Sequence, residues 1–147
     1  MTVLDAYAVL AFLRAEPAAG EVTRLLEDGS AALTAIGVAE VVDHLVRVAG
    51  AEEEAVALDL AQLGLLECIA VSAPLGLAAG RLRARRYHRT RCAVSMADCV
   101  AAEAARAVPT SLATSDPHLL DVCRAEGIGA IALPGSDGSR WRASGGR

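Results

Sequence analysis

Four acidic residues occupy positions where an acid is unusual. Asp5 and Asp116 follow short apolar runs, at 3–4 and 112–113, at the places where buried strands would end. Glu40 and Asp98 lie within apolar segments that have helical periodicity. An acid among apolar residues is costly unless something compensates for its charge, so these four residues are candidates for chemistry.

A cluster of such acids needs a counter-charge. Two carboxylates about 4 Å apart repel each other by about 4 kcal/mol at an effective dielectric constant of about 20, so a cluster must take up protons or a cation. Oxygen ligands without competing His or Cys suit Mg²⁺ or Mn²⁺. A bound ion of this kind lowers the pKa of a water molecule and stabilises a leaving oxyanion. The pattern therefore indicates a site for a divalent metal ion.

A plainer interpretation is that the acids cap helices. Asp116 precedes Pro117, which suits a first helical position, and Asp5 precedes an apolar helical stretch. Caps leave Glu40 and Asp98 unexplained, because we place both inside helices. Both interpretations stay open for Asp5 and Asp116.

The surrounding pattern predicts an α/β domain with a mainly parallel sheet, because short apolar runs alternate with longer helical stretches. Thr34 and Ser95 are predicted helix caps. The expected strands are 2–4, 31–33, 66–71, 111–113 and 128–133, and the expected helices are 7–14, 17–28, 34–50, 52–63, 74–82 and beyond, 96–108 and 117–126.

Length and composition fit one globular domain. The chain has 147 residues, of which 54% are hydrophobic and 22% charged, enough apolar surface for a single core. We expect a domain over residues 1–134 and a flexible tail over 135–147, where Gly, Ser and Arg dominate. No run is long enough to span a membrane and no signal peptide precedes the first strand, so we expect a cytoplasmic protein.

Residue types that are missing exclude several kinds of site. All 14 basic residues are Arg, and the absence of Lys argues against P-loop, Schiff-base, receiver-domain and haloacid-dehalogenase chemistry. The Cys residues, at 68, 92, 99 and 123, form no CxxC pair and lie in apolar segments, so we interpret them as small buried side chains rather than zinc ligands.

Four segments together resemble a known family. VLDAYAVLAFL (3–13), TAIGVAEVVDHLVR (34–47), SMADCVAAEAA (95–105) and LATSDPHLL (112–120) are similar to the four acidic motifs of PIN-domain ribonucleases, in particular the VapC toxins of bacterial toxin-antitoxin pairs. Each motif alone is common. Their order and spacing match over residues 2–133, which makes the combination specific.

The resemblance implies a PIN-like three-layer α/β/α fold, with a mainly parallel sheet of about four to five strands, and Mg²⁺-dependent (or Mn²⁺-dependent) endonucleolytic cleavage of RNA. Asp5, Glu40, Asp98 and Asp116 would form the catalytic group. Of these, Asp5, Asp98 and Asp116 would bind the metal, and Glu40 would orient or deprotonate the attacking water. Thr114 resembles the hydroxyl that supports this pocket. Asp43, three residues after Glu40, either joins the pocket or forms a salt bridge at the surface.

An Arg-rich stretch precedes the third motif. Residues 81–91, RLRARRYHRTR, hold six of the 14 Arg residues. Phosphate contacts supply most of the affinity for nucleic acid, so an acidic protein that binds RNA needs a local cationic surface. The predicted RNA contacts are Arg81, Arg85, Arg86, Arg89 and Arg91, and Tyr87 is a candidate for stacking on a base. The alternative is a solvated helix end whose Arg residues pair with surface acids.

The resemblance also implies partners. They are an RNA substrate, with transfer RNA as the first guess, a VapB-like antitoxin that places a cation in the acidic pocket, and a second copy of the chain in a homodimer. The main alternative is a non-catalytic PIN-like module that binds RNA or protein. A phosphatase-type hydrolase is disfavoured, because Tyr7 stands where that class has the second Asp of a DxD pair. A metal-free ribonuclease would use His88 or His118 as a general base.

Overall fold

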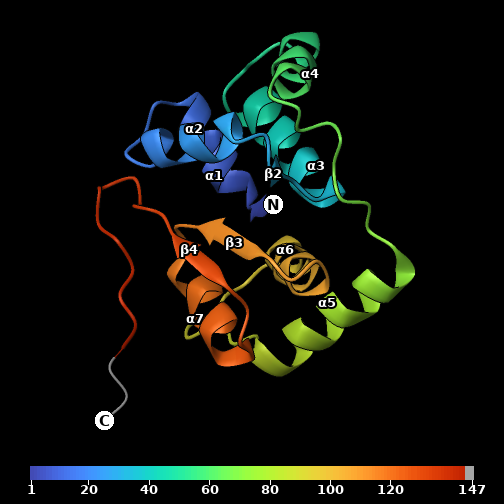
Figure 1. The fold of residues 1–147 in the computed structure, drawn as a ribbon, viewed down its shortest axis with the longest axis vertical. Helices are drawn as coiled ribbons and strands as arrows, with labels where there is room; N and C mark the ends of the chain where they lie inside the picture. Colours follow the sequence, from blue (N-terminus) through green and yellow to red (C-terminus); the bar gives the residue numbers. More distant parts are fainter. Residues whose placement is uncertain (145–147) are drawn as a thin grey trace.

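A parallel four-stranded sheet forms the centre of the molecule (Figure 1). The computed structural model describes residues 1–144. The strands are β1 (Thr2–Leu4), β2 (Ala31–Ala32), β3 (Ser111–Thr114) and β4 (Ala130–Ala132), in the spatial order β2-β1-β3-β4. All three neighbouring pairs are parallel. The predicted α/β fold with a parallel sheet is confirmed, and β4 is the predicted edge strand.

Alternation along the strands divides the core into two layers. Successive strand residues point to opposite faces of a sheet. Leu4 and Ala113 accordingly pack into one apolar cluster, whereas Val3 and Leu112 pack into the other. The helices that follow β1 and β2 cover the first face, and α5 to α7 cover the second (Figure 1). The three-layer arrangement is confirmed.

The helices follow the predicted segments closely. Their bounds are α1 (Ala6–Leu13), α2 (Ala19–Glu27), α3 (Ala35–Asp43), α4 (Glu53–Gln62), α5 (Ala73–Arg86), α6 (Met96–Ala107) and α7 (Pro117–Glu126), and a π-helical turn, η1 (His44–Val48), extends α3. The Thr34 and Ser95 side chains cap α3 and α6 as predicted. Within residues 1–144, no helix is long and apolar enough to cross a lipid bilayer.

The strand predicted over 66–71 is wrong. Within this segment only Ile69 forms a β-type pair, an isolated parallel bridge to Thr34 just after β2. The Ile69 amide donates to the Leu33 carbonyl at 2.8 Å, and the Ile69 carbonyl accepts from Ala35 at 2.9 Å. β2 lies at the edge of the sheet but has only two residues, and α3 begins at Ala35, so the extended chain there is too short for the rest of this segment to pair with.

The strand order creates a crevice at one edge of the sheet. After β1 the chain forms β2 on one side of it, and later returns to form β3 on the other side. The change of direction lies between β1 and β3, and such a switch point opens a crevice at the carboxyl ends of the strands. Asp5 directly follows β1, and Asp116 lies two residues after β3.

The segment after β4 contacts the body of the domain. Arg140 forms a salt bridge with Glu21 and donates to the Ala132 carbonyl at 2.6 Å. The Trp141 indole donates to the Asp121 carboxylate at 3.0 Å. Of the predicted tail over 135–147, residues 145–147 lie outside the part of the chain that the structure describes.

Candidate metal centre

Asp5 is a buried acid at the junction of β1 and α1. Asp5 is only 5% exposed to solvent. One carboxylate oxygen, Oδ1, accepts from the Ala8 amide at 2.8 Å and caps α1, and the other, Oδ2, accepts from the Thr114 hydroxyl. The pKa of Asp5 is raised from 3.8 to about 7, chiefly by burial and to a smaller extent by the nearby Asp98 and Asp116 charges, although the hydrogen bonds from Thr114 and Ala8 lower it.

Thr114 joins Asp5 to Asp116. Its side chain is fully buried at the end of β3. While the Thr114 hydroxyl donates to Asp5, its oxygen accepts from the Asp116 amide at 3.0 Å. The hydroxyl therefore contacts the carboxylate of Asp5 and the backbone amide of Asp116.

Asp116 begins α7. Its Oδ1 accepts from the His118 amide at 2.8 Å and from the Leu119 amide at 3.4 Å, and Pro117 occupies the first helical position. The capping interpretation is thus correct for Asp116 and for Asp5. Capping engages Oδ1 of Asp116, and Oδ2 has no hydrogen-bond partner within residues 1–144.

Asp98 is positioned by a capping box. The Ser95 hydroxyl accepts from the Asp98 amide at 3.0 Å, and Asp98 Oδ2 accepts from the Ser95 amide at 2.8 Å. The expectation that capping does not involve Asp98 is therefore wrong, because the residue lies in the first turn of α6 rather than in its middle. Burial, followed by the charge of Asp116, raises the pKa of the Asp98 carboxyl.

Glu40 enters the same region from α3. It is partly buried, and its carboxylate has no hydrogen-bond partner within residues 1–144. Burial raises the pKa of Glu40 first, and the charges of Asp98 and Asp43 raise it further. Glu40 is thus the one member of the predicted group that no helix cap explains.

Asp98 links the other three acids of the predicted group electrostatically. Asp98 is within electrostatic reach of each of the other three, since its charge acts on the pKa of Asp5 and Glu40 and it responds to Asp116. Of the basic side chains, Arg83 lowers the pKa of Asp98. Burial is the largest cause of the raised pKa of Asp5, Glu40 and Asp98, and the charges of neighbouring acids add to it.

The carboxylates of Asp5, Asp98 and Asp116 are suitable ligands for a hard divalent cation, although they are not arranged around a common point. A carboxylate has about four lone-pair positions, and capping leaves some of them free on Asp5, Asp98 and Asp116. Within residues 1–144, no three His, Cys, Asp or Glu side chains already stand in an arrangement that holds a metal ion. The three Asp side chains would have to move before they could bind one ion together.

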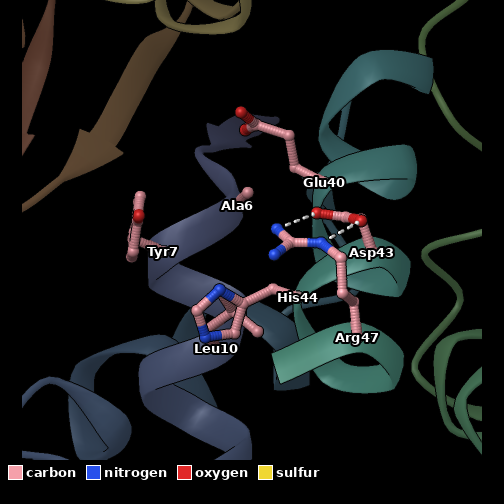
Figure 2. A pocket seen from close by; sticks show the side chains of 7 residues that line it. All are labelled: Ala6, Tyr7, Leu10, Glu40, Asp43, His44 and Arg47. Atoms are coloured by element: carbon pink, nitrogen blue, oxygen red, sulfur yellow. Dashed lines mark hydrogen bonds and ion pairs between the residues drawn. The ribbon is translucent and has the colours of Figure 1, made fainter. Parts of the chain in front are cut away.

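A cavity of about 200 Å³ lies between α1 and α3 beside Glu40. Figure 2 shows the Glu40 carboxylate directed towards the first turn of α1 and the Arg47 guanidinium turned into the space below it. Arg47 donates to both oxygens of Asp43, at 2.9 and 2.8 Å, and this ion pair lowers the pKa of Asp43. Asp43 therefore forms the exposed salt bridge that was one of its two expected roles, and it also lines the cavity that contains Glu40.

A second cavity, of about 260 Å³, lies on the other side of α1 beside Asp116. Arg14 is its basic residue and donates to the His44 ring. Tyr7 and Leu10 line both cavities. The exposed face of α1 thus separates one space that contains Glu40 from another that contains Asp116.

The Arg-rich stretch divides into paired and unpaired residues. Arg85 and Arg86 both bind Glu126, at 3.0 and 2.8 Å, as the alternative interpretation expected. Arg81, Arg89 and Arg91 are exposed and form no ion pair within residues 1–144.

The two His residues considered as general bases have structural contacts. His118 Nδ1 accepts from the Ala93 amide at 3.0 Å. His88 Nδ1 accepts from the Thr90 amide at 3.2 Å and from the Arg91 amide at 3.1 Å, inside a tight turn. The structure thus gives both rings a role in holding the loop before α6.

Sequence reasoning missed Arg47, Arg14 and the position of Tyr7. The i,i+4 spacing of Asp43 and Arg47 on one helix was an available signal for their ion pair. No local signal pointed to the contact between Arg14 and His44, which are 30 residues apart.

Comparisons with known proteins agree with the fold. The sequence matches the family described as PIN domain over residues 2–125. No curated protein matches the sequence. Similar solved structures include FitAcB from Neisseria gonorrhoeae, with 19% identity and a TM-score of 0.64 over 89% of this chain and 96% of that one. FitAB bound to an IR36 DNA fragment has 18% identity and a TM-score of 0.67, over 89% and 94% of the two chains. VapBC2 from Rickettsia felis, bound to a DNA fragment from its promoter, has 20% identity and a TM-score of 0.64, over 88% and 96%.

Proposed function

The chain belongs to the PIN domain family, and from that premise we propose that it is a metal-dependent endoribonuclease that acts as the toxin of a toxin-antitoxin pair. The fold-level similarity to VapBC2 and FitAB supports the VapC-type resemblance drawn from the four motifs. The alternative of a non-catalytic PIN-like module makes different predictions in the experiment below.

The observation that supports the proposal is the electrostatic coupling of Asp98 to Asp5, Asp116 and Glu40, with Asp5 and Asp116 following β1 and β3 at the switch point of the sheet. The three Asp residues are the proposed ligands of Mg²⁺, with Mn²⁺ as a substitute, because carboxylate oxygens suit hard cations. When bound, the ion would supply charge stabilisation for the phosphate and acidify a water molecule.

The residues of the chain have separate tasks in this proposal. Thr114 holds Asp5 and Asp116 in place through one hydroxyl. Glu40 orients the attacking water and accepts its proton at the carboxylate. Burial and two neighbouring acids raise the pKa of Glu40 above its ordinary value, which makes it a better base than a solvated Glu.

The proposed partners follow from the same family. An RNA strand would reach the acids with its phosphates on the exposed Arg81, Arg89 and Arg91, and transfer RNA is the first substrate to test. A VapB-like antitoxin would place an Arg or Lys side chain of its own among the acids and neutralise their charge. This chain has no Lys that could do so. We also propose that the toxin is a homodimer in the cytoplasm.

The direct test is cleavage of total cellular RNA by the purified protein over a Mg²⁺ titration. Asp98→Asn and Glu40→Gln keep the size of each side chain and the capping oxygen of Asp98, so both should abolish cleavage without unfolding the domain. Asp59→Asn on α4 is a matched control, because Asp59 is exposed and outside the group. Site-limited fragments that need Mg²⁺ support the proposal. RNA binding without cleavage by the wild-type protein supports the non-catalytic module instead.

A further inference from the structure

Tyr7 is an exposed aromatic residue beside the candidate metal centre. Its side chain is 60% exposed, in a chain that has only four aromatic residues. Tyr7 lies in the first turn of α1, two residues after Asp5. The His44 ring meets it edge-on, with 6.4 Å between ring centroids and 65° between planes. The Tyr7 hydroxyl has no hydrogen-bond partner within residues 1–144, so no polar contact accounts for the residue.

Tyr7 lies between the two cavities described above. Tyr7 lines the cavity of Glu40 on one side and the cavity of Asp116 on the other. Figure 2 shows its ring projecting from α1 on the side away from Glu40. Each cavity also has one Arg, Arg47 in the first and Arg14 in the second. Tyr7 and Leu10 are the residues that the two cavities share, so the Tyr7 ring lies where a strand occupying both cavities would pass.

The two cavities are more acidic than basic, so an uncharged contact such as an aromatic ring would help to hold RNA there. The acids that line the two cavities outnumber the Arg residues; they are Glu16, Glu40, Asp43 and Asp116. Phosphate contacts alone therefore hold a polyanion weakly here. Stacking of an unpaired base on an aromatic ring is insensitive to these charges and tolerant of sequence.

We propose that Tyr7 stacks on an unpaired base of the RNA next to the phosphate that is cleaved, with Arg47 and Arg14 contacting the phosphates on either side. This inference rests on the proposed nuclease function and adds a preference for single-stranded RNA. Tyr87, the other exposed Tyr, differs because the Arg83 guanidinium already covers one face of its ring at 4.2 Å.

The test separates binding from cleavage. Variants Tyr7→Leu, Tyr7→Phe and Tyr87→Leu are made both in the active protein and in an Asp98→Asn background. Binding of a fluorescein-labelled single-stranded RNA of mixed sequence is compared with binding of the same RNA in a duplex. Loss of one stacked base corresponds to a drop in affinity of about 5-fold to 150-fold.

We expect Tyr7→Leu to weaken single-strand binding by that factor, to leave duplex binding unchanged and to raise the KM for cleavage. Tyr7→Phe keeps the ring and should behave like the wild type. An abasic nucleotide at the stacked position should remove the difference between Tyr7→Leu and the wild type. Equal affinities of Tyr7→Leu and wild type for single-stranded RNA, or an equal loss in Tyr87→Leu, overturns the stacking role. Absence of both binding and cleavage in the wild-type protein overturns the proposed nuclease function and this inference with it.

Discussion

Replacing Asp5 with Asn should stabilise the metal-free protein at neutral and alkaline pH. Burial raises the pKa of Asp5 from 3.8 to about 7, so the folded state holds a proton that the unfolded chain has lost. Asn keeps an oxygen for the Ala8 amide but carries no charge. The substitution therefore removes the cost of ionising a buried acid and retains the helix cap.

The size of the effect follows from the raised pKa. A rise from 3.8 to about 7 corresponds to about 4 kcal/mol at about 1.36 kcal/mol per pH unit. Because a raised pKa in an acid makes the folded state bind more protons, the wild-type protein loses this stability as the pH rises from about 4 to about 7. The Asn variant does not. For a chain of this size, the melting-temperature difference between the two proteins should change by roughly 8–16 °C between pH 4 and pH 8. The loss of the Oδ2 acceptor for the Thr114 hydroxyl lowers the stability of the variant, and this offset varies little with pH.

The assay is thermal unfolding of both proteins in EDTA from pH 4 to pH 8, with Asp59→Asn as the control for an exposed acid. The melting temperature of Asp5→Asn should rise relative to the wild type across this range. Adding Mg²⁺ at pH 8 should then stabilise the wild type, by about 2.7 kcal/mol at 100 times the dissociation constant, and leave Asp5→Asn unchanged. A melting-temperature difference that is constant with pH, or that falls as the pH rises, refutes the reasoning.

Three further changes test other parts of the structure. Glu126→Gln removes the carboxylate shared by Arg85, Arg86 and Arg106, which lower the pKa of Glu126 to about 2. Above pH 5, urea unfolding should show a free energy of unfolding about 1–2 kcal/mol lower than that of the wild type. This difference should shrink towards pH 2 as the wild-type carboxylate becomes protonated. Thr114→Val removes the hydroxyl between Asp5 and Asp116, so unfolding at pH 8 without metal should show a loss of about 1–3 kcal/mol, and an unchanged free energy of unfolding would exclude that role. Joint replacement of Arg81, Arg89 and Arg91 by Ala should flatten the dependence of single-stranded RNA binding on salt by about 2 in log–log slope, whereas an unchanged slope would place the RNA elsewhere.

Local sequence patterns predicted much of this molecule because its helices begin at local signals. Thr34, Ser95 and Asp116 cap α3, α6 and α7 through side-chain hydrogen bonds to amides two or three residues later. An apolar run at 66–71 could not be recognised as a loop in the same way. Whether such a run becomes a strand depends on a free strand edge, which only the three-dimensional arrangement of β2 and α3 determines.

The acids of the candidate site could be proposed from the sequence, but their interactions could not be predicted from it. The four acids come from four separate segments of the chain, and only the sheet order brings them together. The bond between Thr114 and Asp5 spans 109 residues, and the ion pair of Arg85 with Glu126 spans 41. Long-range contacts of this kind leave no periodic signal in the sequence, which is why pairing within the Arg-rich stretch could not be assigned from it.

The central claim is that the electrostatically coupled acids bind a divalent metal and cut RNA. The most direct measurement compares the wild type with Asp98→Asn in cleavage of transfer RNA and total RNA, at increasing Mg²⁺ and after EDTA. Cleavage at a few sites that rises with Mg²⁺, stops in EDTA and is lost in Asp98→Asn is the predicted result. Cleavage that survives EDTA, or that Asp98→Asn retains in full, would contradict the account.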